Sequence, residues 1–419
     1  MKPTRMHYFT NWRSRPVKAV CASVATFSLL FCLWSLTVWA EEPAACQQTA
    51  FALQEASTIR NLVAKRSVPC KRESKAEIKA FLQRSLEEDL PPERLKYEEM
   101  LYKAIGLIPE KYDYKQGLIT FLVSQIGGYY DPKTKRFIMA DWIPVGSIKG
   151  VLVHELTHAL QDQHFDLVDF IKPENLTTDE GLARMALVEG DASAVMFDAM
   201  RANAHLPPLS SEVSIDSIIL AQVLGQGMIK RVPESIKAMM LFPYTAGLRY
   251  AHTLLRKGGY SRINGAFRNA PRTSREILHP EDYLERPFRS AIPEAHEVMP
   301  GRLLYSDVLG EFGVSSIFAG RPSQKLTGVK AAVGWIGDRA VVVERSDGSI
   351  AIAWRTRWET SQDAAEFCSS YRDYLEYRHG GSFSADGVLK RQGGLIKLRC
   401  STSEVLFSSL NLAEERTGN

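Results

Sequence analysis

The chain has 419 residues, and its 52 lysines and arginines against 48 aspartates and glutamates give a formal net charge of +4. Five of the basic residues and none of the acidic ones lie in the first 40 positions, so the remaining 379 residues carry 47 basic and 48 acidic groups. A nearly neutral body lacks the basic surface of a nucleic-acid-binding protein, and its length predicts one large domain or two.

Residues 1–40 have the pattern of a targeting segment. A basic start precedes an apolar stretch over residues 19–39, and the small residues Val38 and Ala40 fit cleavage before Glu41. We favour a cleaved signal peptide. The alternative is an uncleaved anchor that associates with the membrane through residues 19–39, because this stretch is nearly long enough to span a bilayer. Either interpretation places the rest of the chain outside the cytoplasm, in the periplasm or the extracellular space.

Four cysteines lie outside the targeting segment, at Cys46, Cys70, Cys368 and Cys400. An even number in an exported chain predicts disulfides, and proximity in the sequence favours pairing Cys46 with Cys70 and Cys368 with Cys400. There is no CxxC pair, which argues against a zinc site made of cysteines. We expect residues 41–74 to form an irregular or partly helical N-terminal segment.

The next stretch predicts helices followed by a hairpin. Residues 74–90 and 92–107 are amphipathic at helical spacing and are separated by two prolines, and residues 115–126 are expected to be helical as well. The sequence GGYYDPKTKRFIM at residues 127–139 predicts two short strands joined by a DPKT turn.

A buried helix is predicted over the sequence GSIKGVLVHELTHALQDQ. Ser147 is a suitable N-cap, and Pro144 lies just before the start, where a proline is tolerated. Apolar residues recur at helical spacing, namely Ile148, Val151, Leu152, Leu156, Ala159 and Leu160. This apolar face would bury the helix in a core, as a rigidly held metal site requires.

His154, Glu155 and His158 in this helix follow the pattern HExxH. Positions i and i+4 share one face of a helix, so both imidazoles can reach a single ion. Zinc favours imidazole ligands with one position open for water, and Glu155 beside that water can take its proton. We therefore predict Zn²⁺ as the cofactor. The alternative is a helix with surface histidines and no metal.

A site of this kind needs a third protein ligand, and two residues are candidates. Glu189 lies in a second predicted helix, capped by Thr178 or Asp179, where a carboxylate among apolar residues is costly unless it is paired or binds a metal. His164 stands where HExxHxxGxxH enzymes have their third histidine. Those enzymes turn the chain at the glycine, and Gln161 occupies that position here. Because glutamine adopts a left-handed backbone poorly, we favour Glu189.

The sequence HELTHALQDQHFDL followed by LVEGDA resembles the glutamate-zincins, HExxH metallopeptidases whose third ligand is a glutamate on the following helix. More narrowly, the chain is similar to a group of largely uncharacterised secreted bacterial proteins over about residues 75–375. The segments that carry this likeness are GGYYDPKTKRFIM, PYTAGLRYAHTLLRKGGY, PRTSREILHPEDYL and GWIGDRAVVVERSDG. The resemblance implies a mostly helical zincin-like catalytic domain, which we place at residues 75–300, with zinc held by His154, His158 and Glu189.

The resemblance also bears on the hairpin and on the surroundings of the ligands. In the resembling families a strand such as those in residues 127–139 forms the wall of the cleft and binds an extended peptide as an added strand. The alternative is an ordinary hairpin that covers the core. In the best-known members an aspartate four residues after the ligand glutamate steadies the first histidine, whereas position 193 is serine here. Asp191 and Ser193 are both candidates for this role.

A metallopeptidase needs a hydrogen-bond donor for the oxyanion of its tetrahedral intermediate. Tyr244 and His279 are the candidates, because a phenol or an imidazole can donate and both residues follow the second predicted helix. For each of them the alternative is a structural role, since buried tyrosines and histidines commonly only satisfy hydrogen bonds.

The remainder of the chain changes from helices to strands. We expect helices over residues 213–257 that break at Pro233 and Pro243, and then, over residues 258–302, a long ordered loop with short helices. Beyond about residue 325 the sequence AVVVERSDGSIAIAW predicts a hairpin that turns at Ser-Asp-Gly, and GLIKLRC and EVLFSS predict two further strands. Between the hairpin and these two strands we expect a helix capped by Ser361.

We assign residues 301–419 to a small C-terminal α+β unit. Its tryptophans Trp335, Trp354 and Trp358 are expected in the core rather than at a ligand site. The predicted fold class is therefore α+β, in which a mostly helical zincin-like domain with a small edge hairpin precedes the C-terminal unit.

Together these features predict an exported zinc metallopeptidase that acts on a peptide or protein substrate, with Glu155 as its general base. The sequence makes no prediction of the oligomeric state. One alternative is a catalytically silent envelope protein that keeps the fold and the metal for binding or assembly. Another is a metal-dependent hydrolase of a different amide bond, such as one in the cell wall.

Overall fold

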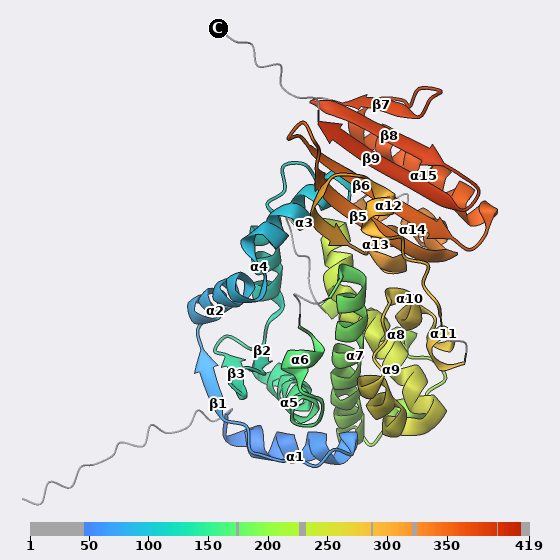
Figure 1. Ribbon diagram of the computed structural model, residues 1–419. Helices are drawn as coiled ribbons and strands as arrows, with labels where there is room; N and C mark the ends of the chain where they lie inside the picture. Colours follow the sequence, from blue (N-terminus) through green and yellow to red (C-terminus); the bar gives the residue numbers. More distant parts are fainter. Residues whose placement is uncertain are drawn as a thin grey trace, which may run out of the picture. The chain divides into compact units, whose positions relative to one another are not determined.

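Helices fill most of the N-terminal two thirds of the described chain, and a large sheet lies at its C-terminal end (Figure 1). This computed structural model describes residues 46–172, 176–225, 232–285, 288–320, 325–391 and 393–411. The predicted leader and residues 41–45 lie outside these ranges. The fold is mixed α+β, which confirms the predicted class. Within the described ranges, no helix combines the length and the apolar character that crossing a membrane requires.

Most of the first helices form where apolar periodicity predicts them, but the helix at residues 49–60 lies in a segment expected to be only partly helical, and the short helix at residues 167–170 was not predicted. The first helices are α1 (Thr49–Arg60), α2 (Lys75–Asp89), α3 (Pro92–Ile105), α4 (Tyr114–Gln125), α5 (Ile148–Phe165), α6 (Leu167–Phe170) and α7 (Thr178–Asn203). The helices that follow are α8 (Asp216–Gly225), α9 (Glu234–Arg268), α10 (Ser274–Leu278), α11 (Pro280–Leu284) and α12 (Ala295–Val298). The start of α2 shows the local cause: the Ser74 hydroxyl accepts from the Glu77 amide, and the Glu77 carboxylate accepts from the Ser74 amide.

Three long helices, α5, α7 and α9, form the centre of the helical part, with α7 between the other two (Figure 1). Two glycines allow α7 and α9 to approach closely. A Cβ atom at Gly190 would lie 2.1 Å from the carbonyl oxygen of Gly247, and one at Gly247 would lie 2.2 Å from that of Ala186. Neither position accepts a side chain without a shift of backbone, so these glycines set the spacing of the two helices beside Glu189.

Replacing Gly247 with alanine is expected to lower the free energy of unfolding by about 1–3 kcal/mol, because the added methyl group would force α9 away from α7. Gly265 lies in the same helix and has no neighbour within 4 Å of an added Cβ atom. Gly265→Ala is therefore the matched control and should raise stability by about 0.5–1 kcal/mol. Urea denaturation followed by circular dichroism measures both effects, and a change of the same sign in the two variants would contradict the close packing.

A small three-stranded sheet lies beside α5. Its order is β1 (Cys70–Glu73), β3 (Arg136–Ala140) and β2 (Gly128–Asp131), with β1 parallel and β2 antiparallel to β3. The hairpin predicted at residues 127–139 is confirmed as β2 and β3, while β1 was not predicted because four residues rich in charge give no strand pattern. This order leaves β2 at one edge of the sheet.

Both predicted disulfides are present, and each fastens a different part of the fold. Cys46 is bonded to Cys70 at a Cα–Cα distance of 5.5 Å, which ties the start of α1 to β1. Cys368 is bonded to Cys400 at 6.2 Å in the C-terminal part. Such bonds form and persist in oxidising compartments, in agreement with export.

The C-terminal part is an antiparallel six-stranded sheet with helices packed against it. The strands, in sheet order, are β4 (Arg302–Asp307), β5 (Trp335–Glu344), β6 (Ile350–Trp358), β9 (Glu404–Asn411), β8 (Gly394–Cys400) and β7 (Val388–Arg391). The helices are α13 (Gly310–Ser316), α14 (Lys325–Ala332) and α15 (Ser361–His379). The hairpin predicted around Ser-Asp-Gly is confirmed as β5 and β6.

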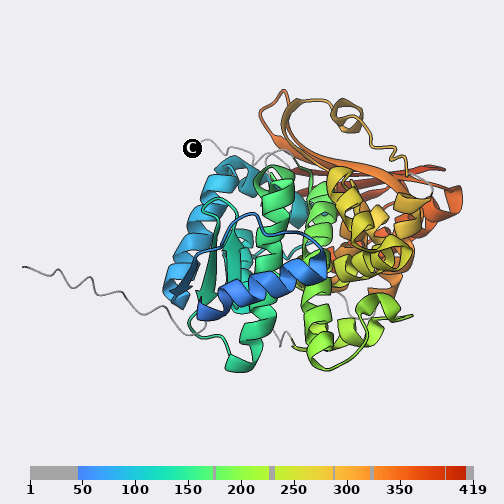
Figure 2. The same cartoon turned by 90° about the horizontal axis from the view of Figure 1, so that it is seen from below.

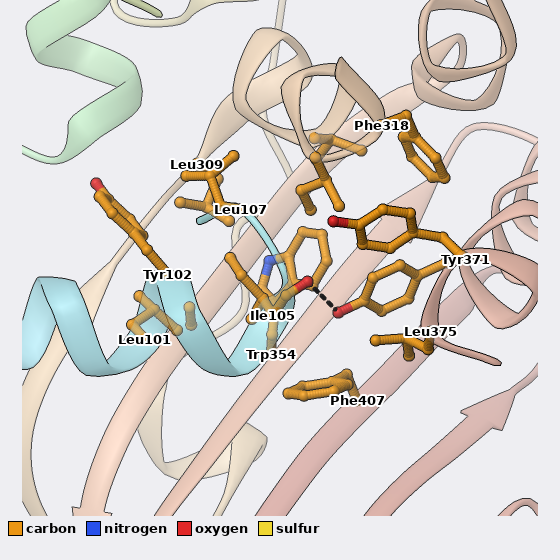
Figure 3. Close-up of a cluster of buried hydrophobic side chains, with 14 of the residues drawn as sticks. Leu101, Tyr102, Ile105, Leu107, Leu309, Phe318, Trp354, Tyr371, Leu375 and Phe407 are labelled. Atoms are coloured by element: carbon orange, nitrogen blue, oxygen red, sulfur yellow. Dashed lines mark hydrogen bonds between the residues drawn. The ribbon is translucent and has the colours of Figure 1, made fainter. Parts of the chain in front are cut away.

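The core of this sheet also includes helix α3 from the N-terminal part (Figure 3). The Tyr371 hydroxyl of α15 donates to the carbonyl of Ile105 at 2.9 Å, and the side chains of α3 pack on Trp354 and its neighbours. Trp335, Trp354 and Trp358 are buried, as predicted. One hydrophobic core therefore runs across the boundary that we predict near residue 300.

Two helix starts differ from the prediction by one or two residues. The N-cap of α7 is Thr177, whose hydroxyl accepts from the Glu180 amide, whereas the Thr178 hydroxyl donates to Asp307 at 2.7 Å. The N-cap of α15 is Thr360 rather than Ser361, since Thr360 and Asp363 form a capping box. In both cases adjacent hydroxyl residues offer equivalent caps, and only tertiary contacts select between them.

The predicted helix break at Pro243 is wrong, whereas the one at Pro233 is confirmed. Helix α9 begins at Glu234 and continues through Pro243 to Arg268, with non-helical backbone only at Gly258 and Gly259. A proline inside a helix costs about 3 kcal/mol. The burial of α9 against α7 outweighs this cost. The helical geometry does break at Gly258 and Gly259, where we expected the helices to end, but a second helical stretch continues beyond this kink to Arg268.

Candidate metal centre

Three buried side chains from two helices meet at one point. His154 and His158 project from the same face of α5, and Glu189 comes from the middle of α7. The Nε2 atom of His154 lies 3.1 Å from Oε2 of Glu189 and 3.2 Å from Nε2 of His158. The Nε2 atom of His158 lies 3.4 Å from Oε2 of Glu189. The structure thus brings together the three residues predicted as metal ligands.

These distances fit a metal ion. Tetrahedral zinc, with ligand bonds of about 2.0–2.2 Å, separates neighbouring ligand atoms by roughly 3.3–3.6 Å. Two imidazole nitrogens and one carboxylate oxygen are also a donor set that zinc accepts in hydrolytic enzymes. The three donor atoms within 4.8 Å of one another therefore form a group that could hold a metal ion, and the chemistry of the donors suits zinc.

The cluster attracts positive charge. Burial lowers the pKa of His158, but the carboxylates of Glu189 and Glu155 outweigh this effect and bring the pKa to about 9. Burial raises the pKa of Glu189, and the two imidazoles nevertheless hold it well below its usual range. A metal ion would take the place of the proton on His158, because a metal ligand must be deprotonated.

Metal affinity is therefore expected to rise with pH. Below pH 9 the metal-free cluster holds a proton on His158 that zinc must displace, so the apparent association constant should increase about tenfold per pH unit between pH 6 and 8. Above about pH 9 the dependence should flatten. Competition with a chromogenic chelator at each pH measures the constant. An affinity that does not change over this range would mean that binding releases no proton.

Glu155 lies next to the ligands and contacts the edge strand β2. Its Oε2 atom accepts from the backbone amide of Tyr130 at 2.8 Å, which directs the carboxylate along the cleft. Although part of the side chain faces the cleft, burial of the carboxyl group raises the pKa of Glu155 above its usual value. A raised pKa suits a carboxylate that must accept a proton and release it again.

A second group of contacts holds the hairpin to α5. The buried carboxylate of Asp162 accepts from the Tyr130 hydroxyl at 2.8 Å and pairs with Lys135 and Arg66 at 2.9 Å. The free edge of β2 is therefore fixed beside the HExxH face of α5.

The cluster lies in a cleft of about 440 Å³. Its walls are mostly apolar and include Phe121, Leu122, Ile126, Leu167, Met185 and Met240. Among the described residues that line it, Glu155 and Glu189 are the only ones with a carboxylate, and none is a lysine or an arginine. The cleft thus joins one charged cluster to an apolar surface.

The two oxyanion candidates have different surroundings. Tyr244 of α9 lines the cleft, and its ring stacks on His154 with 6.3 Å between ring centroids. Burial, with the charges of Glu189 and Glu155, raises the pKa of its hydroxyl well above 10, so the proton stays available for donation. His279 does not line the cleft. His279 lies at the junction of α10 and α11, and its Nε2 atom is 2.9 Å from Oε1 of Glu311. It therefore has a structural partner away from the ligands.

His164 is also separate from the cluster. Its Nε2 atom lies 2.8 Å from the carbonyl oxygen of Val63, near the C-terminal end of α5. The helix continues through Gln161 without the turn that would bring a third histidine back.

Asp191 and Ser193 were both candidates for the residue that steadies the first histidine, His154, whereas the contacts of Asp191 lead to the second histidine, His158. Asp191 is fully buried and accepts from the side chain of Gln161, which in turn contacts His158. The Ser193 hydroxyl is buried, and the described residues offer it no hydrogen-bond partner. Asp191 therefore supports the second histidine through Gln161. That arrangement was not predicted, because glutamine in a helix carries no sequence signal for such a role.

Comparison with known proteins reaches only the C-terminal part of the chain. Residues 300–403 match a family described as a domain of unknown function (DUF8575). These residues include the tryptophans of the sheet and exclude the metal cluster. No curated protein and no solved structure matches the chain.

Proposed function

We propose that this chain is an exported zinc metallopeptidase. The observation that carries the proposal is the meeting of His154, His158 and Glu189 within 3.4 Å, in a cleft that also contains Glu155. The resemblance to the glutamate-zincins and the two disulfides add support.

The residues around the cluster have distinct roles in this proposal. When bound by the three ligands, zinc lowers the pKa of water and polarises a carbonyl group. Glu155 accepts a proton from the attacking water and passes it to the leaving amine, for which its raised pKa is suited. Tyr244 donates a hydrogen bond from its hydroxyl to the oxyanion, because that hydroxyl keeps its proton at neutral pH.

The walls of the cleft suggest how a peptide would be held. An extended segment can add to the free edge of β2 as a further strand, with its scissile carbonyl beside Glu155. Side chains next to that carbonyl would meet the apolar walls. A charged side chain there would lose its water without gaining a partner, so we propose that the substrates carry neutral apolar residues around the scissile bond.

A peptide library tests this proposal. The purified full chain loaded with zinc should cleave peptides beside leucine or phenylalanine at least about tenfold faster than matched peptides with aspartate or lysine at those positions. Mass spectrometry of the products measures the preference, and removal of zinc with a chelator should stop cleavage. A zinc-loaded protein that cleaves no member would favour a binding role, and cleavage of cell-wall amides alone would identify a different hydrolase.

A further inference from the structure

The ring of His158 is held on the side that faces away from the cluster. Its Nδ1 atom lies 2.8 Å from Oε1 of Gln161, one turn further along α5, and both residues are buried. The orientation of the Gln161 amide follows from its other contacts. Its Nε2 atom lies 3.0 Å from the carbonyl of Val188 and 2.9 Å from a carboxylate oxygen of Asp191, and both of these groups only accept hydrogen bonds.

This orientation determines which nitrogen of His158 carries a proton. Because the NH₂ group of Gln161 is used by two acceptors, its carbonyl oxygen faces Nδ1, and Nδ1 must be the donor. The neutral imidazole then has a free lone pair at Nε2, the atom that faces Glu189 and His154. Gln161 thus selects the tautomer that a metal ligand needs.

A second buried charge holds Gln161 in place. The carboxylate of Asp191 is fully buried, and Nε of Arg60, which is equally buried, lies 2.8 Å from its Oδ2 atom. Arg60 also donates to Asn264 at 2.8 Å, and its guanidinium lies 4.8 Å from the ring centre of Tyr260. Without Arg60, Asp191 would be a buried carboxylate with no opposite charge, a state that proteins avoid by protonation or rearrangement.

Arg60 comes from outside the two ligand helices. It is the last residue of α1, which packs against both α5 and α7 and, in the view from below in Figure 2, runs across in front of them. The Cys46–Cys70 disulfide fastens the other end of this helix to the small sheet. The N-terminal segment therefore supplies a charge to the support of the metal cluster.

We propose that Gln161, Asp191 and Arg60 are positioning residues that orient His158 and set the metal affinity of the centre. The inference rests on the proposed metal site, and it makes α1 part of that site although none of its side chains lines the cleft. The three residues act through His158 and contact neither substrate nor metal. Loss of this support is expected to weaken zinc binding 10- to 100-fold.

Gln161→Met tests the first contact. Methionine has a similar length and removes the hydrogen bonds to His158 and Asp191, so the dissociation constant for zinc should rise 10- to 100-fold. Gln163→Met is the matched control, since Gln163 is also buried in α5 but hydrogen-bonds Lys65 and Arg66 instead of the cluster. It should leave the zinc constant within about twofold. Equal weakening in both variants, or none in Gln161→Met, would overturn the proposal.

Arg60 is tested by a rescue. Arg60→Met should weaken zinc binding, because it leaves Asp191 unpaired. The double variant Arg60→Met/Asp191→Asn removes the unpaired charge and keeps an oxygen that accepts from Gln161, so it should recover most of the affinity. A double variant that binds zinc no better than Arg60→Met would contradict the proposed role of Arg60 in holding Asp191 and Gln161.

A direct measurement on the unaltered chain covers the case in which a variant fails to fold. Nuclear magnetic resonance with ¹⁵N-labelled histidine distinguishes the two imidazole tautomers. With zinc bound, the proton on Nδ1 of His158 should be hydrogen-bonded to Gln161 and therefore exchange slowly with water, and an Nδ1 proton that exchanges rapidly would overturn the proposal. If the unaltered chain binds no zinc, the proposed function fails. If the unaltered chain binds zinc but Gln161→Met binds it equally well, only the proposed support of His158 by Gln161, Asp191 and Arg60 fails.

Discussion

Glu155→Gln is expected to lower kcat/KM for peptide hydrolysis by about 10²- to 10⁴-fold while zinc remains bound. Glutamine has the same shape and can still accept the hydrogen bond from the Tyr130 amide, so the edge strand should keep its position. It cannot take a proton from water at neutral pH. The three proposed ligands are unchanged, and elemental analysis should therefore still find one zinc per chain.

Two further measurements make this expectation specific. Glu180→Gln is the matched control, because Glu180 lies on α7, pairs with Arg184 at the start of that helix and does not line the cleft. It should keep nearly full activity. Thermal unfolding of both variants should show the same stabilisation by zinc as the unaltered chain, of about 2.7 kcal/mol at a hundred times the dissociation constant. Unchanged hydrolysis in Glu155→Gln would remove Glu155 from the mechanism.

The sequence predicted the parts of the site that depend on periodicity. His154 and His158 share one face of α5 because any two residues four apart in a helix do so. Glu189 was recognisable since an acid in an apolar helix requires a partner, and the structure brings it to the two imidazoles. The hairpin and the disulfides were likewise predicted from local patterns.

The contacts between distant segments were not predictable in this way. Arg60 and Asp191 are 131 residues apart, and nothing local to either residue indicates that they pair. Gly190 and Gly247 read as ordinary helical glycines, although each lies against the backbone of the other helix. Tertiary packing also overrode a local rule at Pro243, which lies within α9 instead of ending it. The periodic features thus locate the ligands, and long-range packing determines how they are held.

Removing one ligand at a time is the second test with a large expected effect. His158→Ala and Glu189→Ala should each weaken zinc binding by more than the 10- to 100-fold that the loss of a supporting residue causes, because each removes a donor atom itself. After dialysis against a chelator, the unaltered chain should retain about one zinc and both variants almost none. Stabilisation by zinc in thermal unfolding should disappear in parallel.

His164→Ala is the control that decides between the two candidates for the third ligand. The His164 ring faces the Val63 carbonyl at 2.8 Å, on a part of α5 away from the cluster, so its loss should leave zinc content and affinity unchanged. The reverse pattern, in which Glu189→Ala keeps a full equivalent of zinc and His164→Ala loses it, would move the third ligand to His164. In the glutamate-zincins the third ligand is a glutamate on the following helix, whereas His164 lies on α5 itself. That result would therefore also reject the similarity to the glutamate-zincins on which the proposed function draws.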